Sequence, residues 1–105
     1  MANTFRADML QGKVAFVAGA SSGINQRIAE RLATAGARVA MISRSEEKIG
    51  LAAEKIREQG GDALGMAADV RDYDSVAATL KKARDHYGEI DIVLSGAAGN
   101  FVAPA

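Results

Sequence analysis

Glycines and small polar residues gather at one point of the sequence, where they could bind an anion. Gly19 and Gly23 enclose residues 20–22 and follow directly on the apolar run of residues 14–18. A helical pattern begins immediately afterwards, so we expect a strand, a tight turn and a helix N-terminus. The unpaired N–H groups and the positive dipole end of such a helix attract a phosphate. No Lys-Ser or Lys-Thr pair follows Gly23, which excludes a P-loop.

Short apolar runs alternate with amphipathic segments around this turn. The predicted strands cover residues 13–18, 38–43, 63–68 and 90–94. The predicted helices begin at Ile24, cover residues 46–59, and begin again at Asp72 or Asp74. Continuous apolar strands indicate a parallel sheet with both faces covered.

These elements define the fold class and the domain boundaries that we expect. The β-α-β-α-β-α-β order predicts a Rossmann-type, doubly wound α/β fold with four strands in the order 3-2-1-4. Residues 1–12 are expected to form an N-terminal arm. Residues 13–105 are expected to form a truncated dinucleotide-binding half of the fold, with Ile92–Leu94 as an exposed parallel edge.

The end of the second predicted strand indicates which dinucleotide binds. An acidic residue about 20 positions beyond the glycines would bind the ribose 2′-hydroxyl of NAD. Ser43 and Arg44 occupy that place, so no carboxylate repels a 2′-phosphate and a guanidinium can pair with one. We therefore predict NADP(H) as the cofactor. The alternative is that Arg44 is simply a solvated side chain at a strand end.

Composition argues against several classes of protein. Thirteen basic and thirteen acidic residues cancel, so no charge pattern favours nucleic acid or an anionic membrane. The chain has no cysteine, and we predict no metal site. No run approaches the roughly 18 apolar residues of a membrane span, and Met1–Gln11 does not suit a signal peptide. We predict a cytoplasmic protein.

Three motifs together resemble those of the short-chain dehydrogenase/reductase family. Residues 17–24 resemble its Thr-Gly-x-x-x-Gly-Ile-Gly fingerprint, and residues 69–70 and 95–99 fall where the family has an Asp-Val pair and an Asn-Asn-Ala-Gly turn. The resemblance extends from Lys13 onward. It departs from the family at Ala18, at Asn25, and at residues 95–96. Asparagine tolerates left-handed backbone, so we expect the first turn to keep its shape.

The resemblance assigns roles to residues at three turns. It implies that Asp69 lies near the adenine amino group and Val70 against the ring. By topology, residues 97–99 border the same crevice as the first turn, where small side chains leave room for ribose and nicotinamide. The predicted cofactor-binding residues are Gly19, Ser21, Ser22, Gly23, Ile24, Asn25, Ser43, Arg44, Asp69, Val70, Ala97, Ala98 and Gly99.

The family resemblance also implies a catalytic Ser, Tyr and Lys placed well downstream. Neither Tyr73 nor Tyr87 has a lysine four residues later, so we assign no catalytic residue within this chain. In such enzymes the tyrosine near the lysine transfers a proton while NADPH delivers hydride. We therefore expect the chain to be the cofactor-binding part of a longer reductase that forms homodimers or homotetramers.

Residues 97–105 narrow the expected substrate. They resemble the Ala-Ala-Gly-Asn-Phe…Pro-Ala segment of 2,4-dienoyl-CoA reductases, which implies that Asn100 and Phe101 face the substrate. The alternative is that Phe101 packs in the core and Asn100 caps a turn. We predict an NADP(H)-dependent enoyl-CoA, dienoyl-CoA or other acyl-thioester reductase of fatty acid metabolism. Ketoreductases acting on 3-oxoacyl thioesters, sugars or alcohols remain open, as does a non-catalytic nucleotide-binding module.

Overall fold

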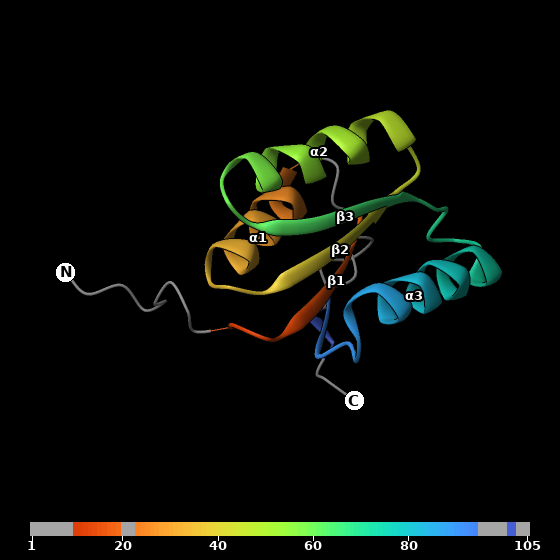
Figure 1. The fold of residues 1–105 in the computed structure, drawn as a ribbon. Coiled ribbons are helices and arrows are strands. Elements are labelled where there is room, and N and C mark those ends of the chain that lie inside the picture. The colour runs from red at the N-terminus through yellow and green to blue at the C-terminus, as the bar shows by residue number, and fades with distance from the viewer. Residues whose placement is uncertain (1–9, 20–22, 95–100, 103–105) are drawn as a thin grey trace.

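The computed structural model describes residues 10–19, 23–94 and 101–102. The strands are β1 (Val14–Ala18), β2 (Arg38–Ser43), β3 (Asp62–Ala67), β4 (Ile92–Leu94) and β5 (Phe101–Val102). The helices are α1 (Gly23–Thr34), α2 (Glu46–Glu58) and α3 (Tyr73–Tyr87). Strands and helices alternate as far as β4, and they pack as layers around one sheet (Figure 1).

The sheet has the order β3-β2-β1-β4-β5. Strands β1 to β4 are all parallel, which confirms the predicted four-stranded order and the doubly wound fold class. The register places Phe16 opposite Ala40 on one side and opposite Val93 on the other. The carboxyl ends of the parallel strands therefore meet at one edge of the sheet, where ligands bind in such folds.

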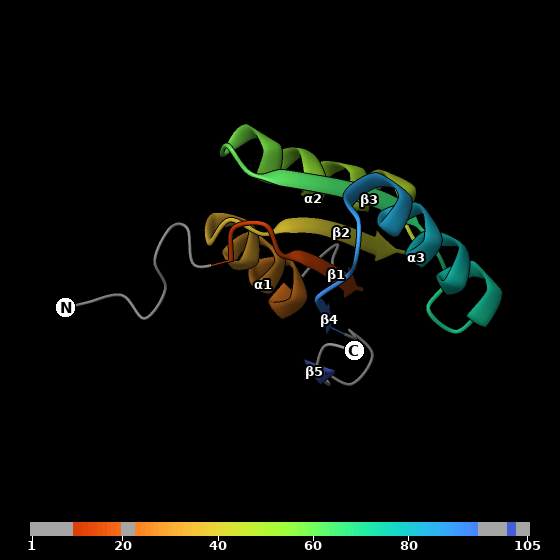
Figure 2. The same cartoon turned by 60° about the horizontal axis from the view of Figure 1, so that its bottom comes forward.

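The prediction of an exposed parallel edge at Ile92–Leu94 is wrong. Strand β5 pairs antiparallel with β4, with Val93 opposite Val102 and Leu94 opposite Phe101. Figure 2 shows β5 beyond β4 at that side of the molecule. A strand of two residues is too short to show a hydrophobic periodicity in the sequence, so only its pairing with β4 identifies β5.

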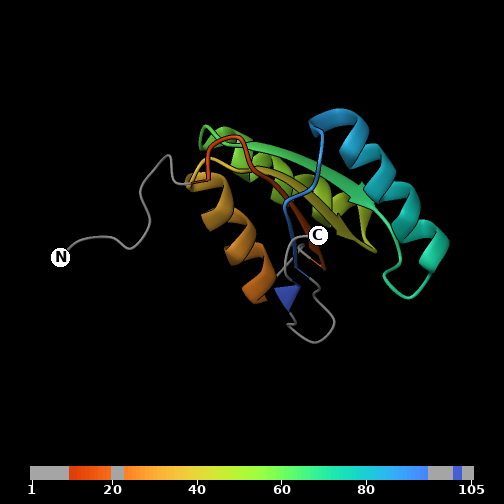
Figure 3. The ribbon, with the colours of Figure 1, turned by 90° about the horizontal axis from the view of Figure 1, so that it is seen from below.

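The two faces of the sheet have separate cores. Alternate residues of β1 divide between them: Ala15 and Val17 pack with α1 and α2, whereas Phe16 and Ala18 pack with α3. Figure 3 shows α1 and α3 on opposite sides of the strands. All five residues of β1 are buried, as expected for a central parallel strand covered on both faces.

Side chains at the helix N-termini fix where two helices begin. The Ser45 hydroxyl accepts a hydrogen bond from the Lys48 N–H at the start of α2. Asp72, one of the two predicted candidates, caps α3 by accepting from the N–H groups of Asp74 and Ser75. Both caps occupy donors that the first helical turn would otherwise leave unpaired.

Strand β3 runs without interruption through Gly65. A Cβ atom at Gly65 would lie 2.8 Å from the Ile49 carbonyl oxygen and 3.2 Å from the Ala53 Cβ atom. The glycine therefore permits α2 to approach the sheet closely. Across the described ranges, none of the helices combines the length and apolar character that a membrane span requires.

Candidate functional site

The two glycines on either side of residues 20–22 adopt backbone conformations that favour glycine. Gly19 has a φ of 70° and Gly23 a φ of 68°, both in the left-handed region. The Gly19 N–H donates to the Ile42 carbonyl at 2.8 Å, which joins the end of β1 to β2. No atom of the described residues lies within 4 Å of a Cβ built on Gly23, at the start of α1. Ser21 and Ser22 lie outside the described residues.

Asn25 and Ile24 occupy the first turn of α1. The Asn25 side-chain amide donates to the Ala18 carbonyl at 3.2 Å, so it connects the helix to the end of β1. This contact gives the asparagine a local role in holding the turn. Ile24 is 75% exposed, which is unusual for a branched apolar residue and leaves it available to a ligand beside the turn.

The end of β2 presents one buried and one exposed side chain. The Ser43 hydroxyl donates to the Ser45 carbonyl at 3.1 Å and accepts from the Ser45 N–H at 3.2 Å. Ser43 therefore shapes the turn into α2. Arg44, the next residue, is exposed at the same edge. Of these two predicted residues, Arg44 is the one whose side chain could reach an anion in solvent.

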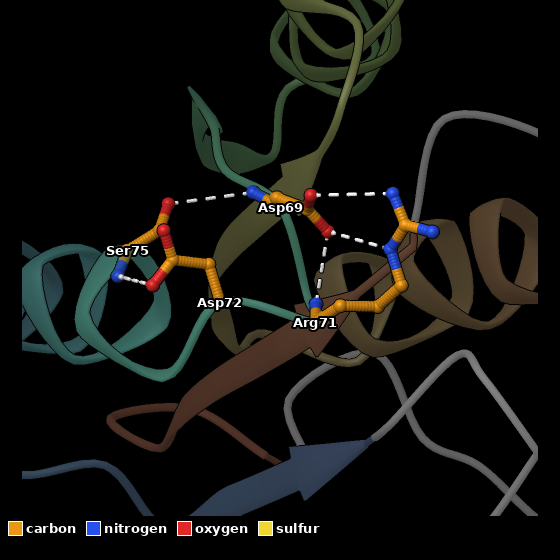
Figure 4. A network of polar contacts seen from close by, with 4 residues as sticks. All are labelled: Asp69, Arg71, Asp72 and Ser75. Atoms are coloured by element: carbon orange, nitrogen blue, oxygen red, sulfur yellow. Dashed lines mark hydrogen bonds and ion pairs between the residues drawn. The ribbon is translucent and has the colours of Figure 1, made fainter.

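The loop after β3 holds Asp69 in a network of polar contacts (Figure 4). The Arg71 N–H donates to Asp69 Oδ1 at 2.9 Å, and the Arg71 guanidinium contacts both carboxylate oxygens at 3.3 and 3.4 Å. The Asp69 N–H donates to the Ser75 hydroxyl in α3 at 3.3 Å. Val70, between the two charged residues, is 37% exposed.

These contacts keep Asp69 ionised. The Arg71 N–H and then its guanidinium lower the pKa of Asp69 from the ordinary value of 3.8, and the nearby charge of Arg44 acts in the same direction. Partial burial opposes them. The site therefore presents a fixed carboxylate close to an exposed arginine. A carboxylate accepts hydrogen bonds only, so a neutral ligand group facing it must be a donor.

Backbone hydrogen bonds hold the three strand ends together. Besides the bond from Gly19 to Ile42, the Ala68 N–H donates to the Ser43 carbonyl at 2.8 Å. The structure thus brings together, at one edge of the sheet, all the predicted site residues that it describes on these turns: Gly19, Gly23, Ile24, Asn25, Ser43, Arg44, Asp69 and Val70. Within the described part of the chain, no group of three or more His, Asp or Glu residues could hold a metal ion.

Other predicted residues cannot be located in the same way. Ala97, Ala98, Gly99 and Asn100 lie outside the described residues. The backbone of Phe101 belongs to β5, and nothing is described of its side chain.

Sequence reasoning missed the partners of Asp69. The signal for Arg71 was weak, because an arginine two residues beyond an aspartate does not by itself predict an ion pair. Ser75 gave no signal, because its hydroxyl meets the Asp69 N–H only once α3 is docked on the sheet.

A model of the short chain dehydrogenase family matches residues 13–105. The chain belongs to this family. The matched region begins one residue before β1. It includes the glycine turn, the ends of β2 and β3, and β5. The family is one of oxidoreductases, which suggests a nicotinamide cofactor.

Among curated relatives of this chain is the peroxisomal 2,4-dienoyl-CoA reductase of Rattus norvegicus, named as (3E)-enoyl-CoA-producing. It is 41% identical over 102 residues, which cover 96% of this chain and 35% of the relative. A relative of the same name from Arabidopsis thaliana is 32% identical over 105 residues and is also covered to 35%. The chain thus spans about a third of the length of these relatives.

Solved structures of the family share its fold. A citronellol catabolism dehydrogenase from Pseudomonas aeruginosa PAO1 superposes with a TM-score of 0.82 at 31% identity, covering 87% of this chain and 38% of the other. A metagenomic short-chain oxidoreductase in complex with NADP superposes with a TM-score of 0.77 at 36% identity, covering 82% and 39%.

Proposed function

We propose that this chain binds NADP(H) for a short-chain reductase that acts on an enoyl-CoA or dienoyl-CoA thioester. The observation that carries the proposal is the meeting of Gly23, Arg44 and Asp69 at one edge of the sheet, each on the turn after a parallel strand. Each would offer what one part of the dinucleotide requires. Gly23 begins a helix whose N-terminus suits the pyrophosphate, Arg44 is a cation for the 2′-phosphate, and Asp69 is an acceptor for the adenine amino group.

The described residues fit such a cofactor. The space beside Gly23 would admit the pyrophosphate without a clash, and a Cβ atom on this positive-φ backbone would be strained. Ile24 and Val70 expose apolar surface at the same edge, as expected for residues that a ring of the bound dinucleotide would cover. When bound, NADPH supplies the hydride. The residues of this chain would hold it and orient it.

The substrate class is supported by the relatives. Those named 2,4-dienoyl-CoA reductases are similar over nearly the whole chain. In our proposal Ser21, Ser22 and residues 97–99 complete the cofactor site, while Asn100 and Phe101 line the substrate end. A Ser, Tyr and Lys elsewhere in the full enzyme would supply the proton chemistry. We further propose that the full enzyme is a homodimer or homotetramer.

Measuring the affinities of the Arg44→Ala variant for NADPH and NADH tests the cofactor choice. We expect the dissociation constant for NADPH to rise about 10- to 100-fold, because a charge-assisted pair with the 2′-phosphate is lost. The affinity for NADH should stay level or increase. Arg84→Ala, which removes an exposed arginine from the far end of α3, is the matched control. Unchanged NADPH affinity in Arg44→Ala, with no gain for NADH, would contradict the proposal.

The substrate class is tested by NADPH oxidation in the protein at its natural full length. A 2,4-dienoyl-CoA should be turned over with a higher kcat/KM than 3-oxoacyl thioesters, sugars or alcohols. Preference for a ketone substrate would favour the ketoreductase alternative. The relatives are peroxisomal by name, so cell fractionation must decide between that compartment and the cytoplasmic location predicted from the sequence.

A further inference from the structure

Arg71 makes contacts that the proposed function does not use. Its side chain lies along the Asp69 carboxylate, with Nε 3.3 Å from Oδ1 and Nη2 3.4 Å from Oδ2 (Figure 4). Its own N–H donates to the same Oδ1 at 2.9 Å. One residue therefore holds the carboxylate through three donors. The Arg71 side chain is itself 71% exposed, so these contacts are not a consequence of packing in a core.

The backbone of Asp69 is anchored as well. Its N–H donates to the Ser75 hydroxyl, and the Ser75 N–H donates to the carboxylate of Asp72, the cap of α3. The backbone of the loop is thus attached to the start of a helix, while the carboxylate orientation depends on Arg71. The two attachments are separable, because neither Ser75 nor Asp72 contacts the Asp69 side chain in these hydrogen bonds.

We propose that Arg71 is a positioning residue for the adenine end of the cofactor site. Its guanidinium orients Asp69 so that the carboxylate accepts a hydrogen bond from the exocyclic amino group of the base. The inference rests on the proposed function and deepens it. Each Asp69 oxygen can accept more than one hydrogen bond, so the contacts with Arg71 leave acceptor capacity for the ligand.

The charge balance of the edge supports this role. The positive charge of Arg44 adds a smaller contribution to the effect of Arg71 in lowering the pKa of Asp69. The Arg71 guanidinium neutralises the carboxylate locally. Arg44 is then available to an anionic ligand, and the phosphates of a dinucleotide meet less repulsion from Asp69.

The test compares NADPH with nicotinamide hypoxanthine dinucleotide phosphate, in which a carbonyl replaces the adenine amino group. We expect the wild-type protein to bind NADPH more tightly, because a carbonyl cannot donate to Asp69. In Arg71→Gln this preference should fall about two- to fivefold, the range expected for an exposed ion pair. Arg71→Lys should restore part of it, since an ammonium keeps the charge but lacks the planar fork.

Two further variants serve as controls, one expected to abolish the preference and one expected to leave it unchanged. Asp69→Ala should remove the preference entirely, and Arg84→Gln, with the same change in charge far from the site, should leave it at the wild-type value. Circular dichroism checks that each variant is folded. A wild-type preference retained in Arg71→Gln would overturn this inference alone. Absence of NADPH binding by the wild-type protein would instead overturn the proposed function.

Discussion

At the scale of single residues, Asp69 combines exposure with a fixed ionisation state. Its carboxylate is partly exposed, yet hydrogen bonds from Arg71 lower its pKa. A lowered folded-state pKa means that the ionised form is favoured by folding. The resulting stabilisation is present above the ordinary value of 3.8 and is lost as the pH falls through the folded-state pKa.

Carboxyl titration by NMR should therefore give Asp69 a pKa below 3.8. In Arg71→Ala we expect the pKa to rise but to stay below this value, because the N–H of residue 71, the largest cause of the shift, remains. Between about pH 5 and pH 8, cofactor affinity should show no inflection due to Asp69. A titration of Asp69 at or above 3.8 in the wild-type protein would contradict the network in Figure 4.

Single residues were predictable where backbone chemistry alone decides their type. Gly19 and Gly23 both adopt positive φ angles, as expected for a tight turn between strand and helix. The contact of Asn25 with the Ala18 carbonyl was not predictable, because an amide can serve as donor or acceptor to many partners. The ion pair of Asp69 with Arg71 likewise depends on the shape of one loop.

At the scale of elements, α2 approaches β3 closely enough to exclude a side chain at Gly65. Gly65 lies against the backbone of α2, with no room for a side chain toward Ile49. The sequence showed only a glycine within an apolar run, which indicates either a break or a close approach. The tertiary structure decides between them, and the strand is continuous.

Gly65→Ala should lower the free energy of unfolding by about 1–3 kcal/mol, because the added methyl group forces strand and helix apart. Gly50→Ala is the matched control: Gly50 lies on the exposed face of α2 with no atom within 4 Å of an added Cβ. There the same change should stabilise the protein by up to about 1 kcal/mol through helix propensity. Urea unfolding of both variants measures the difference; an unaffected Gly65→Ala would refute the close packing.

At the scale of the whole molecule, the amino ends of the strands (the amino edge) and their carboxyl ends (the carboxyl edge) differ in the contacts that their polar groups make. At the amino edge, the Tyr87 hydroxyl donates to Asp62 Oδ1 at 2.7 Å, and the Val14 N–H donates to Asp91 Oδ2 at 2.9 Å. Burial, and then the bond to Asp62, raise the pKa of the Tyr87 phenol. These groups join elements to one another. At the carboxyl edge, Arg44 and Asp69 remain open to solvent.

The layer architecture was predictable because the helices repeat their apolar spacing and the strands between them are short apolar runs. The pairing of β5 was not, since it depends on where two residues return beside β4. The meeting of the first three strand ends was predictable from topology, which places consecutive strand ends together.

The most direct test is a titration of ¹⁵N-labelled protein with NADPH, followed residue by residue. We predict that amide shifts change at the carboxyl edge, at Gly23, Arg44 and Asp69. They should stay constant at the amino edge, at Asp62 and Gly88. Shift changes at the amino edge, or none at saturating NADPH, would contradict the claim that this edge holds the cofactor.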